Sequence, residues 1–471
     1  MPLLHIPDGA LRVPHNQEDI RMIPRTISMA RTLRAGMLLA LGLGVLAPPA
    51  RSQDEAPVTF PDTSAIAQKL QEAKKYPNNI AGEFNPGKGF DLVRTERGSL
   101  NISGYGLIRY LNQMPGDQTF TDHLGRKRAV KARNDIYWHR SFVWLSGFMY
   151  VPQLRYTLSI WSLPTTQQTL VFGNLFYTVN RALTFGSGIA PNLTARSTQG
   201  SWPYWAAADR QMGEEFFRAG FSSGFFIRGE PVSRLNYTAS VNTNLSQLGV
   251  TASNDSRDFA YSASMSWMPT TGEFGARGGV PDLESHQTPA TRFGFSTCTA
   301  RESRGAPVGQ PNNETQLRLS DGVYVFEEGA LADTVTVKNL NYTNLALDAG
   351  VKYRGFTLQG EYYIRRLSNF DATSPVPMSE INDHGFQVEV MHMVVPKTVG
   401  IYAAGGYVFD DFKRNPWELA GGASFFPFKS YLWRLNLHVI HVEKSPTGSN
   451  FGYYTGGQTG TTLSLATDFL F

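Results

Sequence analysis

Apolar and polar residues alternate with a period of two along much of this chain. The last eleven residues, TTLSLATDFLF, place leucines and phenylalanines on one face and smaller or polar residues on the other. The same alternation occurs in LNYTASVN at 235–242 and in WRLNLHV at 433–439. A period of two is that of a strand with two different faces. The pattern therefore predicts a chain built mostly from β-strands.

Sixteen segments carry this pattern. Each is about ten residues long, with apolar residues on one face, small or polar residues on the other and aromatic residues gathered at the ends, as transmembrane barrels require. An even count is also typical of single-chain bacterial barrels. The segments are 100–111, 136–150, 153–162, 169–180, 182–189, 215–228, 233–244, 258–268, 288–297, 343–354, 356–367, 383–395, 398–410, 417–428, 431–443 and 460–471.

The connections between these segments alternate in length. Short connections lie at 151–152, 181, 229–232, 355, 396–397 and 429–430, and long ones at 112–135, 190–214, 298–342, 368–382 and 444–459. Outer-membrane barrels have short periplasmic turns and long outer loops. The stretch 269–287 is an exception, because it is long but falls on the short side. We predict an all-β fold, a 16-stranded antiparallel transmembrane β-barrel with inward-folding loops.

The C-terminus supports this prediction. A strand of a soluble sandwich alternates too, but a terminal Phe on the apolar face is typical of the closing strand of bacterial outer-membrane barrels. We therefore expect Phe469 and Phe471 to form the signal that the barrel-assembly machinery reads, and we expect the outer membrane of a Gram-negative-type bacterium as the location.

The N-terminus indicates export. Residues 35–47, AGMLLALGLGVLA, follow Arg31 and Arg34 and precede a small-residue cleavage site before Gln53, which is the layout of a secretory signal. Met29 opens a signal of normal length, so a misassigned start is one interpretation of 1–28. We divide the chain into a signal peptide at 1–52, a periplasmic segment at 53–97 and a barrel at 98–471. Residues 62–75, DTSAIAQKLQEAKK, predict a short helix, either a linker or a trimer contact.

Composition narrows the function. Charged residues make up 17% of the chain, against about 25% in soluble domains. The signal peptide holds six basic and three acidic residues, which leaves 37 basic and 36 acidic residues and gives nucleic-acid binding no support. The single cysteine, Cys298, excludes a disulfide framework, and the histidines show no metal-ligand spacing. We expect neither a metal nor a cofactor.

A barrel of 16 strands is too wide for side chains to fill, so we expect an aqueous channel narrowed by loops. The insertion 190–214 is expected to fold inward, with a surface loop as the alternative. For the insertion 298–342, an inward-folding loop and a lid are equally compatible with the sequence. Basic residues near the bore are the candidates for contact with anions. They are Arg140, Arg196, Arg210, Arg218, Arg301, Arg304 and Lys338.

Most of 98–471 resembles the phosphate-selective porins O and P. The resemblance is carried by GSLNISGYGLIRY in the first strand, LTFGSGIAPN, RQMGEEFFRAGFSSGFF, YSASMSWMP and GGASFFPFKSYLWRLN, and by ADTVTVKNLNYTNLALDAGVKYRGFTLQGEYYIRR. It implies a 16-stranded homotrimeric porin whose third and fifth outer loops fold inward. In the phosphate-specific members, arginines and lysines form a ladder and a constriction ring.

This sequence departs from that pattern in its inward charges. Where that family has paired arginines in the second strand, this sequence has His139 and Arg140. Inward acidic residues stand beside the inward basic ones, namely Asp348, Glu361, Glu389 and Asp468 beside Arg109, Arg155, Arg218 and Arg365. Rings of one charge sign select ions, whereas mixed signs do not predict phosphate binding. We predict passive diffusion of small anionic or polar solutes with a modest anion preference, and phosphate or polyphosphate as candidate solutes.

Two other classes stay open. A non-conducting anchor or adhesin barrel would result if the loops plugged the bore. An outer-membrane enzyme would need a nucleophile or acid paired with a base. His438, His441 and Glu443 lie on one late strand, but the spacing puts the two histidines on opposite faces. We therefore expect no enzymatic activity.

Overall fold

The structure is a computed structural model. It describes residues 67–68, 71–72, 86–164, 168–200, 203–245, 258–271, 274, 279–305, 317–448 and 452–471. The signal peptide lies outside these residues, as does most of the predicted helix at 62–75, of which 67–68 and 71–72 are helical. Within the described ranges, no helix is long and apolar enough to cross a membrane.

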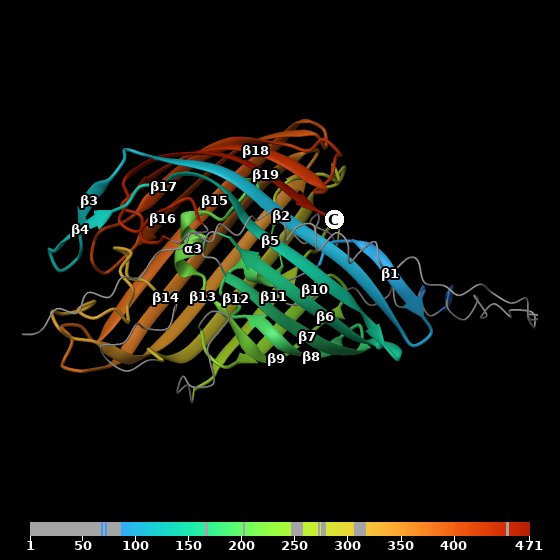
Figure 1. The fold of residues 1–471 in the computed structure, drawn as a ribbon, viewed down its shortest axis with the longest axis horizontal. Helices are drawn as coiled ribbons and strands as arrows, with labels where there is room; N and C mark the ends of the chain where they lie inside the picture. Colours follow the sequence, from blue (N-terminus) through green and yellow to red (C-terminus); the bar gives the residue numbers. More distant parts are fainter. Residues whose placement is uncertain are drawn as a thin grey trace, which may run out of the picture. The chain divides into compact units, whose positions relative to one another are not determined.

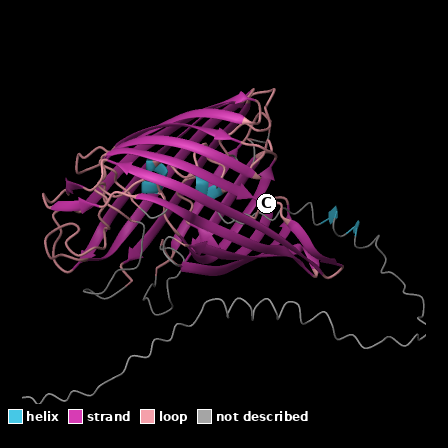
Figure 2. Cartoon of the chain, turned by 45° about the horizontal axis from the view of Figure 1, so that its top comes forward, coloured by secondary structure: helices cyan, strands magenta, loops and turns pink. Residues whose placement is uncertain are grey.

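Sixteen strands in the described part of the chain form one closed antiparallel sheet (Figures 1 and 2). Each strand pairs with the next along the chain, and β19 pairs with β2 to close the barrel. The strands are β2 (Gly98–Met114), β5 (Asn134–Met149), β6 (Val151–Leu163), β7 (Gln168–Asn180), β8 (Leu183–Pro191), β9 (Phe221–Val232), β10 (Leu235–Asn242), β11 (Ala260–Trp267), β12 (Ala290–Ser303), β13 (Val337–Tyr353), β14 (Phe356–Ala372), β15 (Glu380–Val395), β16 (Val399–Phe409), β17 (Trp417–Phe425), β18 (Trp433–Glu443) and β19 (Gly460–Leu470).

The barrel confirms the predicted fold class, with three corrections at element boundaries. The predicted strand 215–228 begins at Phe221, because 212–217 form a helix. The predicted insertion 298–342 shrinks to 304–336, because β12 and β13 extend into it. The predicted connection 112–135 contains a small hairpin of β3 (Gln118–Thr121) and β4 (Lys127–Val130).

The two faces of the wall follow the alternation in the sequence. Leu347 and Leu437 are about half exposed on the outside, at 50% and 46%, whereas Ser240 and Ser264 are buried on the inside. The predicted second strand is apolar on both faces, and its Trp144 is fully buried on the inside. An apolar exterior and a largely polar interior are what a barrel in lipid requires.

Phenylalanines and glycines pack together where the barrel closes. The Gly104 and Phe471 backbones exchange two hydrogen bonds of 3.1 and 3.0 Å. A Cβ atom at Gly104 would lie 2.7 Å from the Phe471 ring, and one at Gly106 would lie closer still to the Phe469 ring. Both positions therefore need glycine beneath the rings. Beyond Phe471, a short strand β1 (Phe90–Thr95) pairs with the remaining edge of β2.

We call the end of the barrel that holds Phe471 and the short connections the turn end, and the opposite end the loop end. The hairpin β3–β4 lies at the loop end, and β1 lies at the turn end (Figure 1). In outer-membrane barrels the short turns face the periplasm.

Candidate functional site

The connection between β8 and β9, residues 192–220, folds into the barrel as the sequence predicts. We call it the inner loop. It contains a 3₁₀ turn, η2 (Arg196–Gln199), and a short helix, α3 (Met212–Phe217). Almost all of its described residues are buried, and α3 contacts β14, β15 and β16 inside the ring of strands (Figure 1).

A buried loop must find hydrogen-bond partners for its backbone. Inward side chains of the wall supply them. The Arg434 guanidinium donates to the carbonyl oxygens of Trp205, at 2.7 Å, and Ala207, at 2.9 Å. The Ser424 hydroxyl donates to the carbonyl oxygen of Ala206 at 2.7 Å. These three carbonyls are thereby held against β17 and β18.

Wall acceptors hold the loop's N–H groups in the same way. Glu361 accepts from the Arg196 backbone at 2.6 Å, Glu418 from Met212 at 2.9 Å and Gln387 from Glu214 at 3.0 Å. Glu361 is one of the inward acidic residues that the sequence suggested would give the bore a mixed lining. In the structure it also anchors the inner loop.

The basic candidates on this side of the bore pair with acidic residues of the loop. Asp209 Oδ2 lies 2.5 Å from Arg140 Nη2 and 3.2 Å from Arg109 Nη1. Arg109 also donates to the carbonyl of Gly452 and lies over the Tyr453 ring. All three charged side chains are almost fully buried. A loop carboxylate thus ties the inner loop to β2 and β5.

A second set of ion pairs lies within the inner loop. Arg210 Nε lies 2.9 Å from Glu214 Oε1, and Arg218 Nη2 lies 3.5 Å from Glu215 Oε2. Burial, together with the positive charge of Arg218, lowers the pKa of Arg210 to about 10, so Arg210 stays protonated at neutral pH. Burial tends to raise the pKa of Glu215, but Arg218 and Arg210 outweigh it and lower that pKa.

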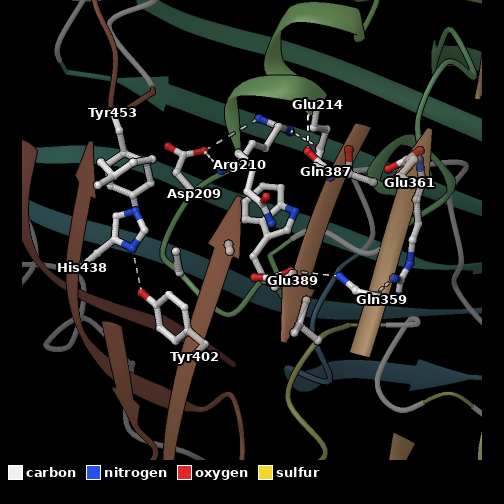
Figure 3. A pocket seen from close by; sticks show the side chains of 18 of the residues that line it. Asp209, Arg210, Glu214, Gln359, Glu361, Gln387, Glu389, Tyr402, His438 and Tyr453 are labelled. Atoms are coloured by element: carbon white, nitrogen blue, oxygen red, sulfur yellow. Dashed lines mark hydrogen bonds and ion pairs between the residues drawn. The ribbon is translucent and has the colours of Figure 1, made fainter. Parts of the chain in front are cut away.

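A central cavity lies between the inner loop and the wall (Figure 3). On β14 and β15, amide and carboxylate side chains stand directly opposite one another, Gln359 facing Glu389 and Glu361 facing Gln387. Aromatic and imidazole rings line another side, from Trp205, Tyr402, His438 and Tyr453. The space left in the middle is about 30 Å³. The inner loop therefore narrows the bore strongly.

The other predicted site residues are more scattered. Arg196 lines the central cavity, and its guanidinium donates to the Gln359 side chain. Arg304 is buried and donates to the Phe326 carbonyl at 3.2 Å. Arg301 and Lys338 are exposed, and Arg301 lies on the outer face of β12, 3.9 Å from Asp258. The structure does not bring these two side chains to the central cavity, and the strands extend further into this insertion than the sequence indicated.

Three segments fold over the loop end. Residues 317–336 of the second insertion pack through buried apolar side chains such as Leu319 and Phe326. Arg318 of this segment donates to the carbonyl of Gly448, in the connection between β18 and β19, at 2.6 Å. The hairpin β3–β4 joins the same cover, because Arg128 pairs with Glu327 at 2.8 Å. These contacts join the three segments at the loop end.

The sequence did not indicate a contribution from the turn end. Phe274 and Val280, in the long connection between β11 and β12, are fully buried. The Val280 N–H donates to the carbonyl of Tyr204 in the inner loop at 2.7 Å. The one sequence feature that points to this contribution is the length of the connection 269–287. It is long, although the other connections at this end of the barrel are short turns.

The chain matches no known protein-family profile, and no curated protein is recognisably related to it. Among solved structures, the outer-membrane expressed OmpT of Vibrio cholerae is similar with a TM-score of 0.49 and 10% identity, covering 80% of this chain and 99% of that one. An anion-selective porin from Comamonas acidovorans has a TM-score of 0.47 and 11% identity, over 79% and 100% of the chains. The outer membrane channel DcaP of Acinetobacter baumannii has a TM-score of 0.43 and 11% identity, over 81% and 99%.

Proposed function

We propose that this protein is an outer-membrane channel through which small polar solutes diffuse passively. One observation carries the proposal: a closed 16-stranded barrel with an apolar exterior surrounds a polar interior, and an inward loop narrows that interior. Barrels of this size enclose more space than their own wall side chains fill. The inner loop is then the element that limits passage.

The proposal also concerns the class of solute that passes through the channel. Fixed charges beside a narrow bore focus the electric field and select ions. Arg196 and Arg210 line the central cavity, but so do Asp209, Glu214, Glu361 and Glu389. Both signs of charge line the cavity, which supports weak discrimination between ions. The modest anion preference rests on the sequence resemblance rather than on this lining. Phosphate as the favoured solute rests on the sequence resemblance.

Planar-bilayer recording tests both parts. We expect the purified protein to conduct and to give a reversal potential on the anion side in a salt gradient. Arg210→Glu with Arg218→Glu should shift the reversal potential toward cations. Arg210→Gln with Glu214→Gln is the matched control, because it removes an ion pair without changing the net charge.

The outcomes separate the alternatives. Absence of conductance in a correctly folded barrel contradicts the channel and favours an anchor. An unchanged reversal potential in the charge-reversal variant removes these arginines from the pore. Block of chloride current by micromolar phosphate would show that the resemblance extends to the solute.

Location, assembly and the lack of enzymatic activity are proposals of the same kind. The outer membrane fits the apolar exterior, and membrane fractionation tests it. A homotrimer is implied by the sequence resemblance, and cross-linking of the detergent-extracted protein tests it. Lipase and protease assays test the expectation that the protein is not an enzyme.

A further inference from the structure

One segment at the turn end lies inside the barrel although its neighbours are short turns. We call it the turn-end segment: Phe274 and residues 279–289, between β11 and β12. Phe274 is fully buried. Its ring lies 5.3 Å from the guanidinium carbon of Arg196 and 4.8 Å from Lys352 Nζ. A Cβ atom at Gly350 would lie 2.7 Å from this ring, so the wall makes room for it with a glycine.

The turn-end segment is bonded to the inner loop. Besides the 2.7 Å bond from the Val280 N–H to the Tyr204 carbonyl, Val280 and Leu283 belong to the same apolar cluster as Ala206 and Ala207. The inner loop is thus held from the side by the wall and from the turn end by this segment.

A buried aspartate fastens the segment to the barrel. Asp282 is fully buried, and its carboxylate accepts the Gly355 N–H at 2.8 Å and contacts His286 Nδ1 at 2.5 Å. The Arg354 N–H donates to the His286 carbonyl at 2.7 Å. The neighbouring Glu284 is exposed. Asp282 therefore connects the segment to the tight turn between β13 and β14.

We propose that the turn-end segment is a second element of the constriction, and that Phe274 and Asp282 set its conductance and ion preference. The inference rests on the proposed channel function. An aromatic face attracts cations, so the Phe274 ring holds Arg196 and Lys352 against itself. The ring also packs behind Arg196, whose side chain lines the central cavity. Without the ring, both cations face a wider passage.

The experiment compares four single variants in planar bilayers, each first shown to fold as a heat-modifiable barrel. Phe274→Ala should raise the conductance about twofold or more, because pore width sets passage, and should shift the reversal potential toward anions. Phe274→Tyr keeps the ring and should restore both values to those of the unaltered protein. Asp282→Asn should raise the conductance by freeing the segment. Asp333→Asn makes the same chemical change at the loop end, on a side chain that is 87% exposed, and should change nothing.

The reversal potential shows whether Phe274 positions Arg196 and Lys352 or only supports the packing, since looser packing alone would not move the reversal potential toward anions. The inference is overturned if Phe274→Ala keeps the original conductance and reversal potential, or if Asp333→Asn acts as strongly as Asp282→Asn. If no form conducts, the channel proposal itself fails, and this inference fails with it.

Discussion

Arg434 is the residue whose removal should release the inner loop most directly. It is fully buried on β18 and donates to the Trp205 and Ala207 carbonyls while pairing with Asp468 at 2.7 Å. Arg434→Met keeps most of the volume and removes these loop contacts, together with a longer hydrogen bond of 3.5 Å to the Pro203 carbonyl. Because Arg434→Met alone would leave a buried unpaired carboxylate, which is strongly destabilising, Asp468→Asn should accompany it.

The size of the effect follows from the two shorter of the lost hydrogen bonds. A hydrogen bond to a charged group contributes about 1.5–3 kcal/mol, so two contribute at least about 3 kcal/mol. Since about 1.4 kcal/mol corresponds to a factor of ten, the ratio of displaced to anchored inner loop should rise on the order of 100-fold. Arg434→Lys keeps the positive charge and loses only the two-point guanidinium contact with Asp468, so it should have a smaller effect.

Single-channel recording gives the readout. The double variant should spend more time in a state of higher conductance than the unaltered protein. Arg366→Met is the matched control, because Arg366 lies on the outside of β14 with 57% of its side chain exposed. If the double variant folds and shows the original conductance with no additional open state, these hydrogen bonds do not hold the constriction.

Three further predictions concern assembly, the two faces of the wall and pH. Phe471→Ser or deletion of Phe471 should leave periplasmic, protease-sensitive protein, because the ring packs on Gly104 at the seam; normal yields of heat-modifiable barrel would contradict this. Leu347→Arg or Leu437→Arg should impair folding, at a cost of about 2–4 kcal/mol for a charge in lipid, whereas Ser240→Arg or Ser264→Arg should fold and change the conductance; the opposite ranking in folding yields would contradict the assigned faces. Burial tends to raise the pKa of Asp122, but hydrogen bonds from Arg128 and Arg126 lower this pKa to about 2. The hairpin β3–β4 should therefore be fully stabilised by this carboxylate above pH 3.9, which is about the pKa of an aspartate in the unfolded chain. It should lose this stabilisation as the pH falls toward 2. A spin label at Thr119 should gain mobility over that range, and no such change should occur in Asp122→Asn.

Local pattern was sufficient to predict the barrel but not its interior. Strand alternation and connection length depend on neighbouring residues, so all sixteen strands were predictable with shifts at their ends. The contacts of the inner loop join residues far apart in sequence, such as Trp205 with Arg434, and no periodicity encodes them. An inward Glu361 therefore looked like a pore charge when it is also a backbone acceptor. Phe274 had no sequence signal beyond the length of its connection.

The short strand β1 also has a consequence for how the barrel forms. It occupies the edge of β2 immediately beyond the end of β19, where Phe90 pairs with Ile102. If β19 slipped two residues toward the turn end, Phe471 would take the place of Phe90. Strands in a barrel can close with alternative staggers, each giving a different tilt and width. The hairpin of β1 and β2 forms from adjacent residues, whereas β19 arrives more than three hundred residues later. β1 thus occupies the positions on β2 into which β19 would have to slip, and its pairing there disfavours any stagger of the barrel that needs this slip.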